Sequence, residues 1–147
     1  MNPQLNSSET GPLREPSPVR IQSSCFVCGQ DNPRGLRIRF QRNEQGEVSA
    51  LWSPAPVWEG FKGIVHGGVV SAVLDEAMSK AVSSSGCEAL TAELQVRFRR
   101  PVASGQSFLV RGWIVRRSKR LVRTESTLTD RDGLEHAHAW ASFLSIR

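Results

Sequence analysis

What this sequence lacks excludes several broad classes of protein. No apolar run approaches the roughly 20 residues that a membrane-spanning helix needs, and no segment resembles a signal peptide. The chain has three cysteines, an odd number that fits a reducing compartment better than a disulfide framework. A serine nucleophile elbow, a phosphate loop and a dinucleotide fingerprint are all missing, which removes most common hydrolases and nucleotide enzymes. We therefore expect a cytoplasmic protein whose chemistry rests on another arrangement of residues.

Metal-ligand patterns are also scarce. Cys25 and Cys28 have the spacing of half a zinc site, but a structural zinc needs four ligands and no second CxxC exists. Cys87 is far away, and no carboxylate or cysteine pattern around His136 and His138 suggests ligation. We expect no metal ion, a loop with buried cysteines at 25–28, and histidines that belong to a sheet face.

The length and charge of the chain set further limits. A chain of 147 residues fits one domain with a single core. Residues 1–22 hold four prolines among polar residues, which predicts a disordered or strap-like leader, and residues 23–147 are expected to form the domain. The net charge of +5 is moderate and is compatible with nucleic acid, a membrane surface or anionic metabolites as partners.

Hydrophobic periodicity predicts one long helix with strands before and after it. Alternation at 36–40 and 48–52, with a turn at 43–46, predicts a hairpin. Residues 65–82 have the i, i+3, i+4 apolar spacing of a buried helical face. Four more strands are expected at 90–99, 107–117, 121–130 and 134–146. One helix with an apolar face packs most simply against an antiparallel sheet curled around it, which is an α+β fold.

The strand at 90–99 has a predicted inner and outer face. Alternation assigns Ala92, Leu94, Val96 and Phe98 to the inner face. Thr91 falls with the charged and polar residues on the opposite face. By alternation alone, Thr91 therefore points away from the helix.

The predicted helix begins just after His66, at Gly67 and Gly68. A helix start leaves backbone N–H groups free, with the positive end of the helix dipole behind them. Such an end binds anions, and equally the developing oxyanion of an attacked carbonyl group. The sequence thus predicts an anion or oxyanion site at this point.

Two adjacent carboxylates on the helix have different surroundings. Asp75 lies opposite the main apolar stripe, within a second, smaller apolar patch, so it must be paired or have a chemical role. Glu76 has Lys80 four positions later, which predicts a surface ion pair. We interpret Asp75 as the chemical residue and Glu76 as structural, although Asp75 is also compatible with a solvated back of the helix.

A basic stretch follows the helix. Between Arg97 and Thr124 there is no acidic residue, whereas lysine and arginine recur throughout. The turn at 116–120 is a candidate phosphate-binding surface, and a solvated outer sheet face is the alternative. Nucleic acid is a third possibility, but no recognised motif or interleaved aromatic platform supports it.

Several motifs resemble one known family. The most specific motif is HGGVVSAVLDEAM, within residues 65–78, which is preceded by GFKGIV. The other two motifs are TAELQVRFRRPV, after the helix, and CFVCGQDNPRGLRIRF, which resembles the leader of many bacterial members. With these motifs the chain looks like acyl-CoA thioesterases of the hotdog superfamily, in the phenylacetate-degradation-protein branch. The likeness covers roughly residues 25–147. It implies a hotdog fold, in which a curved antiparallel sheet of about five to six strands wraps a long central helix. It also implies dimers that often form tetramers, and an acyl-CoA substrate with no separate cofactor.

The resemblance also implies roles for particular residues. The backbone N–H of Gly67 or Gly68, next to His66, would polarise the thioester carbonyl. Asp75 would act as nucleophile or general base, and Thr91 would help position the attacking water. The charge pattern, and not the resemblance, supplies the candidate substrate-binding residues, which are Glu59, Arg99, Arg116, Arg117, Lys119 and Arg120.

One departure from the family pattern leaves an alternative open. Relatives often carry Asn or Gln about six residues before the histidine, where this chain has Gly60. Either Glu59 substitutes for that side chain or its hydrogen bond is missing. The alternatives are a non-catalytic acyl-CoA sensor or carrier and, less favoured, a nucleic-acid binder.

Helical geometry adds an expectation about assembly. Asp75 lies nine positions after His66, which is roughly 13 Å along the helix axis and on a different face. The two side chains therefore cannot share one reacting atom within a chain. They meet only if two chains bring their helices together, so catalysis is expected to need a dimer.

Overall fold

A computed structural model describes Ser17–Pro18 and residues 23–146. One long helix, α1 (Gly67–Ser84), follows a short 3-10 turn, η1 (Pro56–Trp58). The strands are β1 (Ser17–Pro18), β2 (Gln41–Arg42), β3 (Val48–Trp52), β4 (Ala89–Phe98), β5 (Phe108–Ser118), β6 (Leu121–Thr129) and β7 (Glu135–Ser145).

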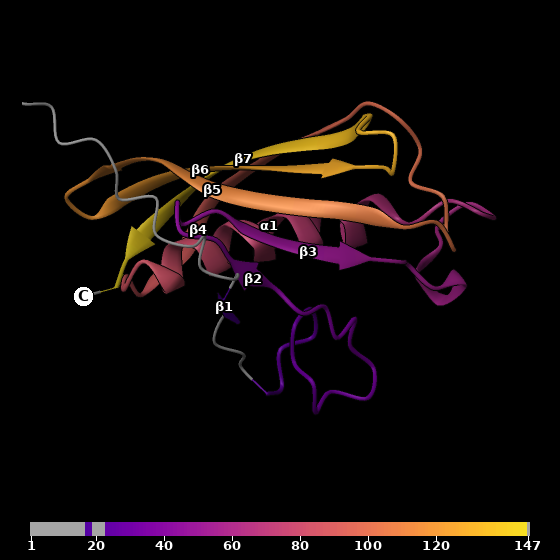
Figure 1. The fold of residues 1–147 in the computed structure, drawn as a ribbon, viewed down its shortest axis with the longest axis horizontal. Coiled ribbons are helices and arrows are strands. Elements are labelled where there is room, and N and C mark those ends of the chain that lie inside the picture. The colour runs from indigo at the N-terminus through magenta and orange to yellow at the C-terminus, as the bar shows by residue number, and fades with distance from the viewer. Residues whose placement is uncertain (1–16, 19–22, 147) are drawn as a thin grey trace, which may run out of the picture.

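The strands form one antiparallel sheet in the order β1-β2-β3-β5-β6-β7-β4. Five strands are long and two contain only two residues each. The helix lies along one face of the curved sheet, as Figure 1 shows. The predicted α+β arrangement of one helix against an antiparallel sheet is confirmed.

The core forms where α1 packs against the inner face of the sheet. The predicted apolar stripe is buried from Val70 to Ala81, and Val69 is half-buried. Small residues let the two layers approach closely: a Cβ atom at Gly112 of β5 would lie 2.6 Å from the carbonyl oxygen of Ala77. Only glycine fits there, and this contact sets β5 across the middle of the helix.

The predicted hairpin before the helix is only partly correct. Residues 36–40 alternate between exposed and buried as expected, with Ile38 and Phe40 buried. The strand itself is confined to β2, because Leu36 and Ile38 donate their N–H groups to Phe26 and Val27 of the preceding loop. The alternation correctly predicted which side chains of residues 36–40 are buried, but the backbone of this segment pairs with a loop and not with a strand.

Strand β4 differs from its predicted pattern in two ways. It is the last strand of the sheet, and most of its residues are exposed in the single chain. Of the residues assigned to the inner face, Val96 packs against the core, whereas Ala92, Leu94 and Phe98 are exposed. A register shift between Thr91 and Glu93 marks a β-bulge at Ala92. The extra residue changes the phase of the alternation, so Thr91 points toward α1 and not away from it.

Two expectations concern regions or properties that the structure addresses only in part. The predicted leader, residues 1–22, lies outside the described residues except for Ser17–Pro18, whose backbone pairs with β2. In the described part of the chain, no helix has both the length and the apolar character of a membrane span. The division into leader and domain and the cytoplasmic location stay predictions.

Candidate active site

His66 caps the N-terminus of α1 and determines which backbone N–H groups remain free there. Its Nδ1 atom accepts a hydrogen bond from the N–H of Gly68 over 2.9 Å, and its carbonyl oxygen accepts from Val69 and Val70. The N–H of Gly67 has no acceptor among the residues that the structure describes. Gly67 can therefore donate to an incoming oxygen atom, with the positive end of the helix dipole behind it.

The approach to the helix is held by backbone hydrogen bonds. The N–H of His66 donates to the carbonyl of Trp58, and the N–H of Val65 donates to the carbonyl of Val102. Trp58 packs partly against the core, whereas Phe61 is 84% exposed. Of these two aromatic residues, only Phe61 is therefore free to contact a ligand.

A pocket of about 660 Å³ opens beside this end of the helix. Gly67 and His66 line it together with the apolar side chains of Phe61, Ile64 and Phe98. Arg99 and Arg100 also contribute to its lining. The pocket thus combines apolar walls, one free N–H donor and nearby positive charge, which suits a ligand with an apolar part and a polarised carbonyl.

Asp75 lies in the middle of α1 and is joined to β4 by a hydrogen bond. Thr91 Oγ1 donates to Asp75 Oδ1 over 2.8 Å. Burial raises the pKa of Asp75 above its ordinary value, the Thr91 hydrogen bond lowers it, and the neighbouring charge of Glu76 raises it further. A carboxylate with a raised pKa and an oriented hydroxyl group beside it is equipped to accept a proton from water.

The structure gathers the predicted catalytic residues into two groups. His66 and Gly67 line the pocket, whereas Asp75 and Thr91 do not. Eight positions of helix separate Gly67 from Asp75, which is about 12 Å along the axis. Within one chain the two groups are therefore too far apart to act on the same atom.

Comparison with known proteins identifies the family. Residues 62–137, slightly more than half of the chain, match the family model described as the Thioesterase superfamily. The chain belongs to this superfamily. Among curated proteins, it is similar to acyl-coenzyme A thioesterase THEM4 of Bos taurus, with 29% identity over 82 residues. That match covers 55% of this chain and 33% of the relative, so the chain spans about a third of the length of its curated relative.

Solved structures agree on the fold. A crystal structure of a thioesterase superfamily protein has a TM-score of 0.79 at 23% identity, covering 82% of this chain and 62% of the other. The PaaI protein of the Escherichia coli phenylacetic acid degradation operon has a TM-score of 0.71 at 17% identity, covering 76% and 81%. A Streptococcus pneumoniae TIGR4 thioesterase solved with coenzyme A has a TM-score of 0.69 at 15% identity, covering 74% and 84%. The hotdog fold expected from the sequence is confirmed.

Glu59 lies at the edge of the candidate active site. Its carboxylate accepts a 2.5 Å hydrogen bond from Ser104 Oγ and is not part of the pocket lining. Gly60 instead faces the site, since a Cβ atom there would lie 3.3 Å from His66 Cδ2. Glu59 holds the loop before α1 to the loop at 102–107, and its predicted contact with substrate stays a prediction.

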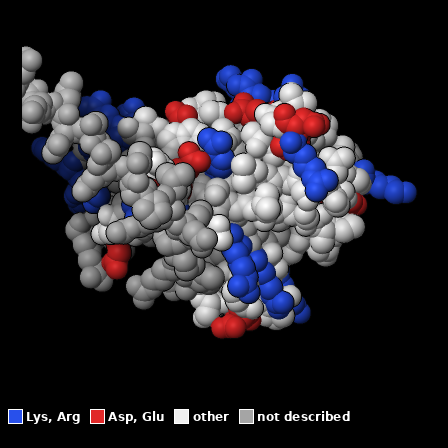
Figure 2. Space-filling model, in the orientation of Figure 1, with Lys and Arg blue, Asp and Glu red and all other residues white. Residues whose placement is uncertain are grey.

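The predicted substrate-binding arginines occupy two ends of the molecule. Arg99 lines the pocket and forms a 2.7 Å ion pair with Glu135. The turn at 116–120 lies at the other end, near the C-terminus of α1, where Figure 2 shows lysine and arginine side chains gathered over the β5–β6 hairpin. In that turn Arg120 donates to the carbonyl of Ser145 from both Nε and Nη2, so it fastens the end of β7.

The two histidines of β7 have separate structural roles. His138 stacks on Trp140 at 4.3 Å, beside two carboxylates on the outer sheet face, as expected for a sheet-face histidine. His136 is buried, and its ring lies 2.9 Å from both the carbonyl of Pro101 and the carboxylate of Asp130. Hydrogen bonding to His136 lowers the pKa of Asp130. His136 therefore anchors the loop that forms one wall of the pocket.

The ion pair between Glu76 and Lys80 is present but is not at the surface. Nζ of Lys80 lies 3.5 Å from Oε1 of Glu76, and the side chains are only 8% and 16% exposed. The loop that carries Cys25 and Cys28 covers them, with Cys25 Sγ 3.6 Å from the same carboxylate oxygen. The predicted surface position of this pair was wrong, because helical spacing does not report what packs on top of a helix.

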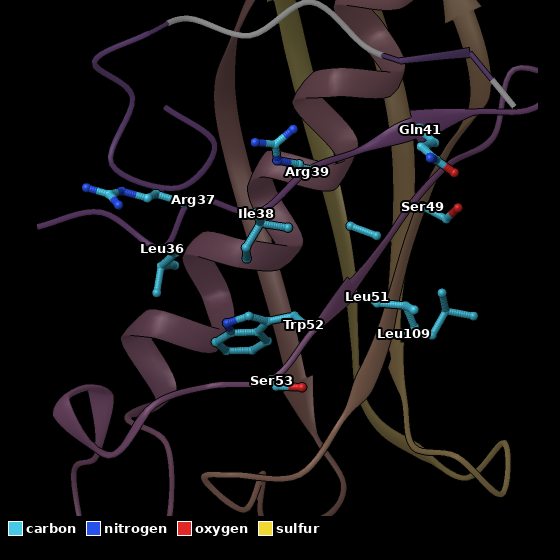
Figure 3. A pocket seen from close by; sticks show the side chains of 11 residues that line it. Leu36, Arg37, Ile38, Arg39, Gln41, Ser49, Leu51, Trp52, Ser53 and Leu109 are labelled. Carbon is cyan, nitrogen blue, oxygen red and sulfur yellow. The ribbon is translucent and has the colours of Figure 1, made fainter. Parts of the chain in front are cut away.

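A second hollow, of about 480 Å³, lies beside β3 (Figure 3). Its lining comes from residues 36–39, Gln41, residues 49–53 and Leu109, and Trp52 lies between it and the helix. Arg37 and Arg39 are its charged residues, and the described lining contains no carboxylate, histidine or cysteine. This hollow offers no pair of groups for acid–base chemistry, so it is not a candidate active site.

Proposed function

We propose that this protein is an acyl-CoA thioesterase that hydrolyses a thioester to a free acid and coenzyme A. The observation that carries the proposal is the free N–H of Gly67 at the mouth of an apolar pocket, at the start of α1. The curated relative THEM4 is named an acyl-coenzyme A thioesterase, and a similar fold was solved with coenzyme A bound. These similarities support hydrolysis of a thioester and argue against the alternative of a non-catalytic sensor or carrier.

In this proposal the site is completed by a second copy of the chain. Strand β4 ends the sheet with ten residues, and its outer edge carries no strand among the described residues. Leu90, Leu94 and Phe98 are 64%, 37% and 52% exposed along it. A long, apolar, unpaired edge is a template for pairing with another strand, and pairing with itself gives a two-fold dimer. Such a dimer would bring Asp75 and Thr91 of one chain to the pocket of the other.

The chemical steps follow from these groups. The thioester carbonyl oxygen accepts the N–H of Gly67, which stabilises the negative charge that develops on it. Ionised Asp75 from the second chain takes a proton from a water molecule held by Thr91, or attacks the carbonyl carbon itself. The carbon–sulfur bond of the tetrahedral intermediate then breaks. In the general-base route, coenzyme A leaves as the thiol with the proton that Asp75 took from water. In the nucleophilic route, it leaves as the thiolate, and water then hydrolyses the acyl–Asp75 anhydride to the free acid. Arg99, at the pocket, is proposed to contact the phosphates of coenzyme A. Because the turn at 116–120 lies at the other end of the chain, Arg116, Arg117 and Lys119 are proposed to reach these phosphates from the second chain.

A panel of aliphatic and aryl acyl-CoA substrates tests the proposed activity. Hydrolysis releases a free thiol, which a chromogenic disulfide reagent detects continuously. We expect turnover of at least one acyl class without added metal or nucleotide. Tight binding of acyl-CoA without thiol release across the whole panel would favour the sensor or carrier.

Replacing Thr91 with valine should move the pH dependence of hydrolysis. The Thr91 hydrogen bond lowers the pKa of Asp75, so its loss raises that pKa further. Because only ionised Asp75 is active, the acid limb of kcat should move to higher pH, by about one unit for a hydrogen bond to a charged group. The matched variant Thr127→Val, on the outer face of β6, should leave the limb in place. An unchanged acid limb in Thr91→Val would mean that Thr91 has no influence on the group whose ionisation limits kcat.

A further inference from the structure

Two cysteines and a glutamate meet behind the candidate active site, although they are distant in sequence. Cys25, Cys28 and Glu76 each place one donor atom within 4.8 Å of the others. Cys28 is 1% exposed, and the Glu76 side chain is 16% exposed. No other group of three such donors in the described part of the chain is as close. The sequence offered only two ligands, because the third lies on α1, far along the chain.

The loop that carries the two cysteines is held in place by its own backbone. The N–H of Gly29 donates to the carbonyl of Cys25 over 2.7 Å, and the N–H of Ile38 donates to the carbonyl of Val27 over 2.9 Å. A side chain at Gly29 would collide with the backbone of Cys25. This tight turn fixes both sulfur atoms toward α1, so the donors are positioned before any ion arrives.

Charge balance shows what the cluster can accept. With both thiols protonated, the charges of Glu76 and Lys80 neutralise each other. If both thiols lose their protons, three negative charges lie beside Lys80, the cation that the described residues place at the cluster. A divalent cation restores neutrality, so the cluster is electrically balanced either with two thiol protons or with one divalent ion.

We propose that Cys25, Cys28 and Glu76 bind one divalent ion of the zinc class. Two thiolates and one carboxylate suit zinc, which takes sulfur and oxygen donors in tetrahedral geometry, and water completes the fourth position. Magnesium and calcium prefer oxygen donors alone. Lys80 keeps the Glu76 carboxylate oriented, as outer partners of metal ligands do. Binding breaks two S–H bonds, forms two zinc–sulfur bonds and releases two protons, with no change of oxidation state.

The proposed ion would fasten the 25–28 loop to α1 at the residue after Asp75. This structural role is independent of thioester hydrolysis, because none of the three ligands lines the pocket. A zinc ion there would stabilise the folded chain, since binding to the native state shifts the unfolding equilibrium. Its affinity should rise with pH, because the thiols must lose protons.

The test uses the full chain, reduced and stripped with a chelator, then titrated with zinc against a chromogenic zinc indicator. We expect one ion per chain, release of about two protons per ion, and a higher melting temperature with zinc. Cobalt added in place of zinc should give a thiolate-to-metal charge-transfer band. Cys25→Ser and Cys28→Ser should abolish that band, and Glu76→Gln should weaken zinc binding at least about tenfold. The control Cys87→Ser, a buried cysteine outside the cluster, should bind as the wild type does.

Several results would overturn the site. One is the absence of stoichiometric zinc binding to the reduced chain. Another is binding that Cys87→Ser weakens as much as Cys28→Ser. If a serine variant fails to fold, Glu76→Gln and the cobalt spectrum of the wild type still decide, because a spectrum without thiolate bands excludes the cysteines as ligands. Loss of hydrolysis alone, with zinc binding intact, would count against the thioesterase proposal and not against this site.

Discussion

Replacing Asp75 with asparagine should reduce kcat for acyl-CoA hydrolysis by at least about 100-fold, the lower range for loss of a general base. Asparagine keeps the size of the side chain and an oxygen that accepts the hydrogen bond from Thr91. It removes the charge and the basicity. Binding of substrate should survive, because Gly67 and the pocket walls are untouched.

The stability of the same variant tests the raised pKa independently. A carboxyl group whose pKa is raised in the folded state supports stability at low pH, and this support is lost as the pH rises through the folded pKa. At a pH above that pKa, ionised Asp75 therefore destabilises the fold, and Asp75→Asn should melt there at the wild-type temperature or above. The matched change Asp132→Asn, in the exposed β6–β7 turn, should affect neither turnover nor melting. Full turnover by Asp75→Asn would remove this residue from the reaction.

Replacing Gly67 with proline should reduce kcat by about 100- to 1,000-fold, the range for loss of one oxyanion donor. Gly67 is the first residue of α1, a position where proline is favoured because its missing N–H is not needed by the helix. His66 has φ −58° and ψ 133°, the extended conformation that a residue before proline adopts. The substitution therefore removes the proposed donor with little change to the backbone.

The companion variant Gly67→Ala separates the N–H from the space around it. Alanine keeps the donor, and its Cβ atom would lie 3.4 Å from Phe98 Cζ, an ordinary contact. We expect Gly67→Ala to retain most of its activity while Gly67→Pro loses it. Equal losses in the two variants would mean that the pocket requires space at this position, and that the N–H is not the oxyanion donor.

Much of the fold could be predicted from local patterns in the sequence. The apolar stripe from Val70 to Ala81 predicted α1 and its buried face, and the strands after it were predicted within one or two residues of their ends. Helix and strand periods differ, so a sustained pattern identifies the element reliably. The placement of His66 and Gly67 at the start of α1 followed from the same pattern.

Other features depend on contacts that periodicity does not contain. The bulge at Ala92 reverses the phase of β4, and only this reversal brings Thr91 to Asp75. Gly68 is one of the two predicted oxyanion donors, but its N–H already donates a hydrogen bond to the Nδ1 atom of His66. The clue to that bond was present, because a polar side chain just before a helix often accepts from its first N–H groups.

Long-range packing accounts for the remaining differences. The pair of Glu76 and Lys80 satisfies the spacing of a surface ion pair, yet a loop some fifty residues earlier covers it. The same loop places Cys25 and Cys28 beside Glu76, so that three possible metal-ligand atoms lie close together where the sequence pattern showed only two. No local window of the sequence includes both partners, so such contacts could not be read from spacing.

The central claim is that each active site combines Gly67 of one chain with Asp75 of another, and mixed dimers test it most directly. Gly67→Pro and Asp75→Asn chains are given different affinity tags, produced together, and purified through both tags. Each heterodimer then has one site with Gly67 and Asp75 intact and one site with neither. We predict that this heterodimer hydrolyses acyl-CoA at about half of the wild-type rate, although each variant alone is nearly inactive. A heterodimer no more active than the two variants separately would contradict a site shared between chains.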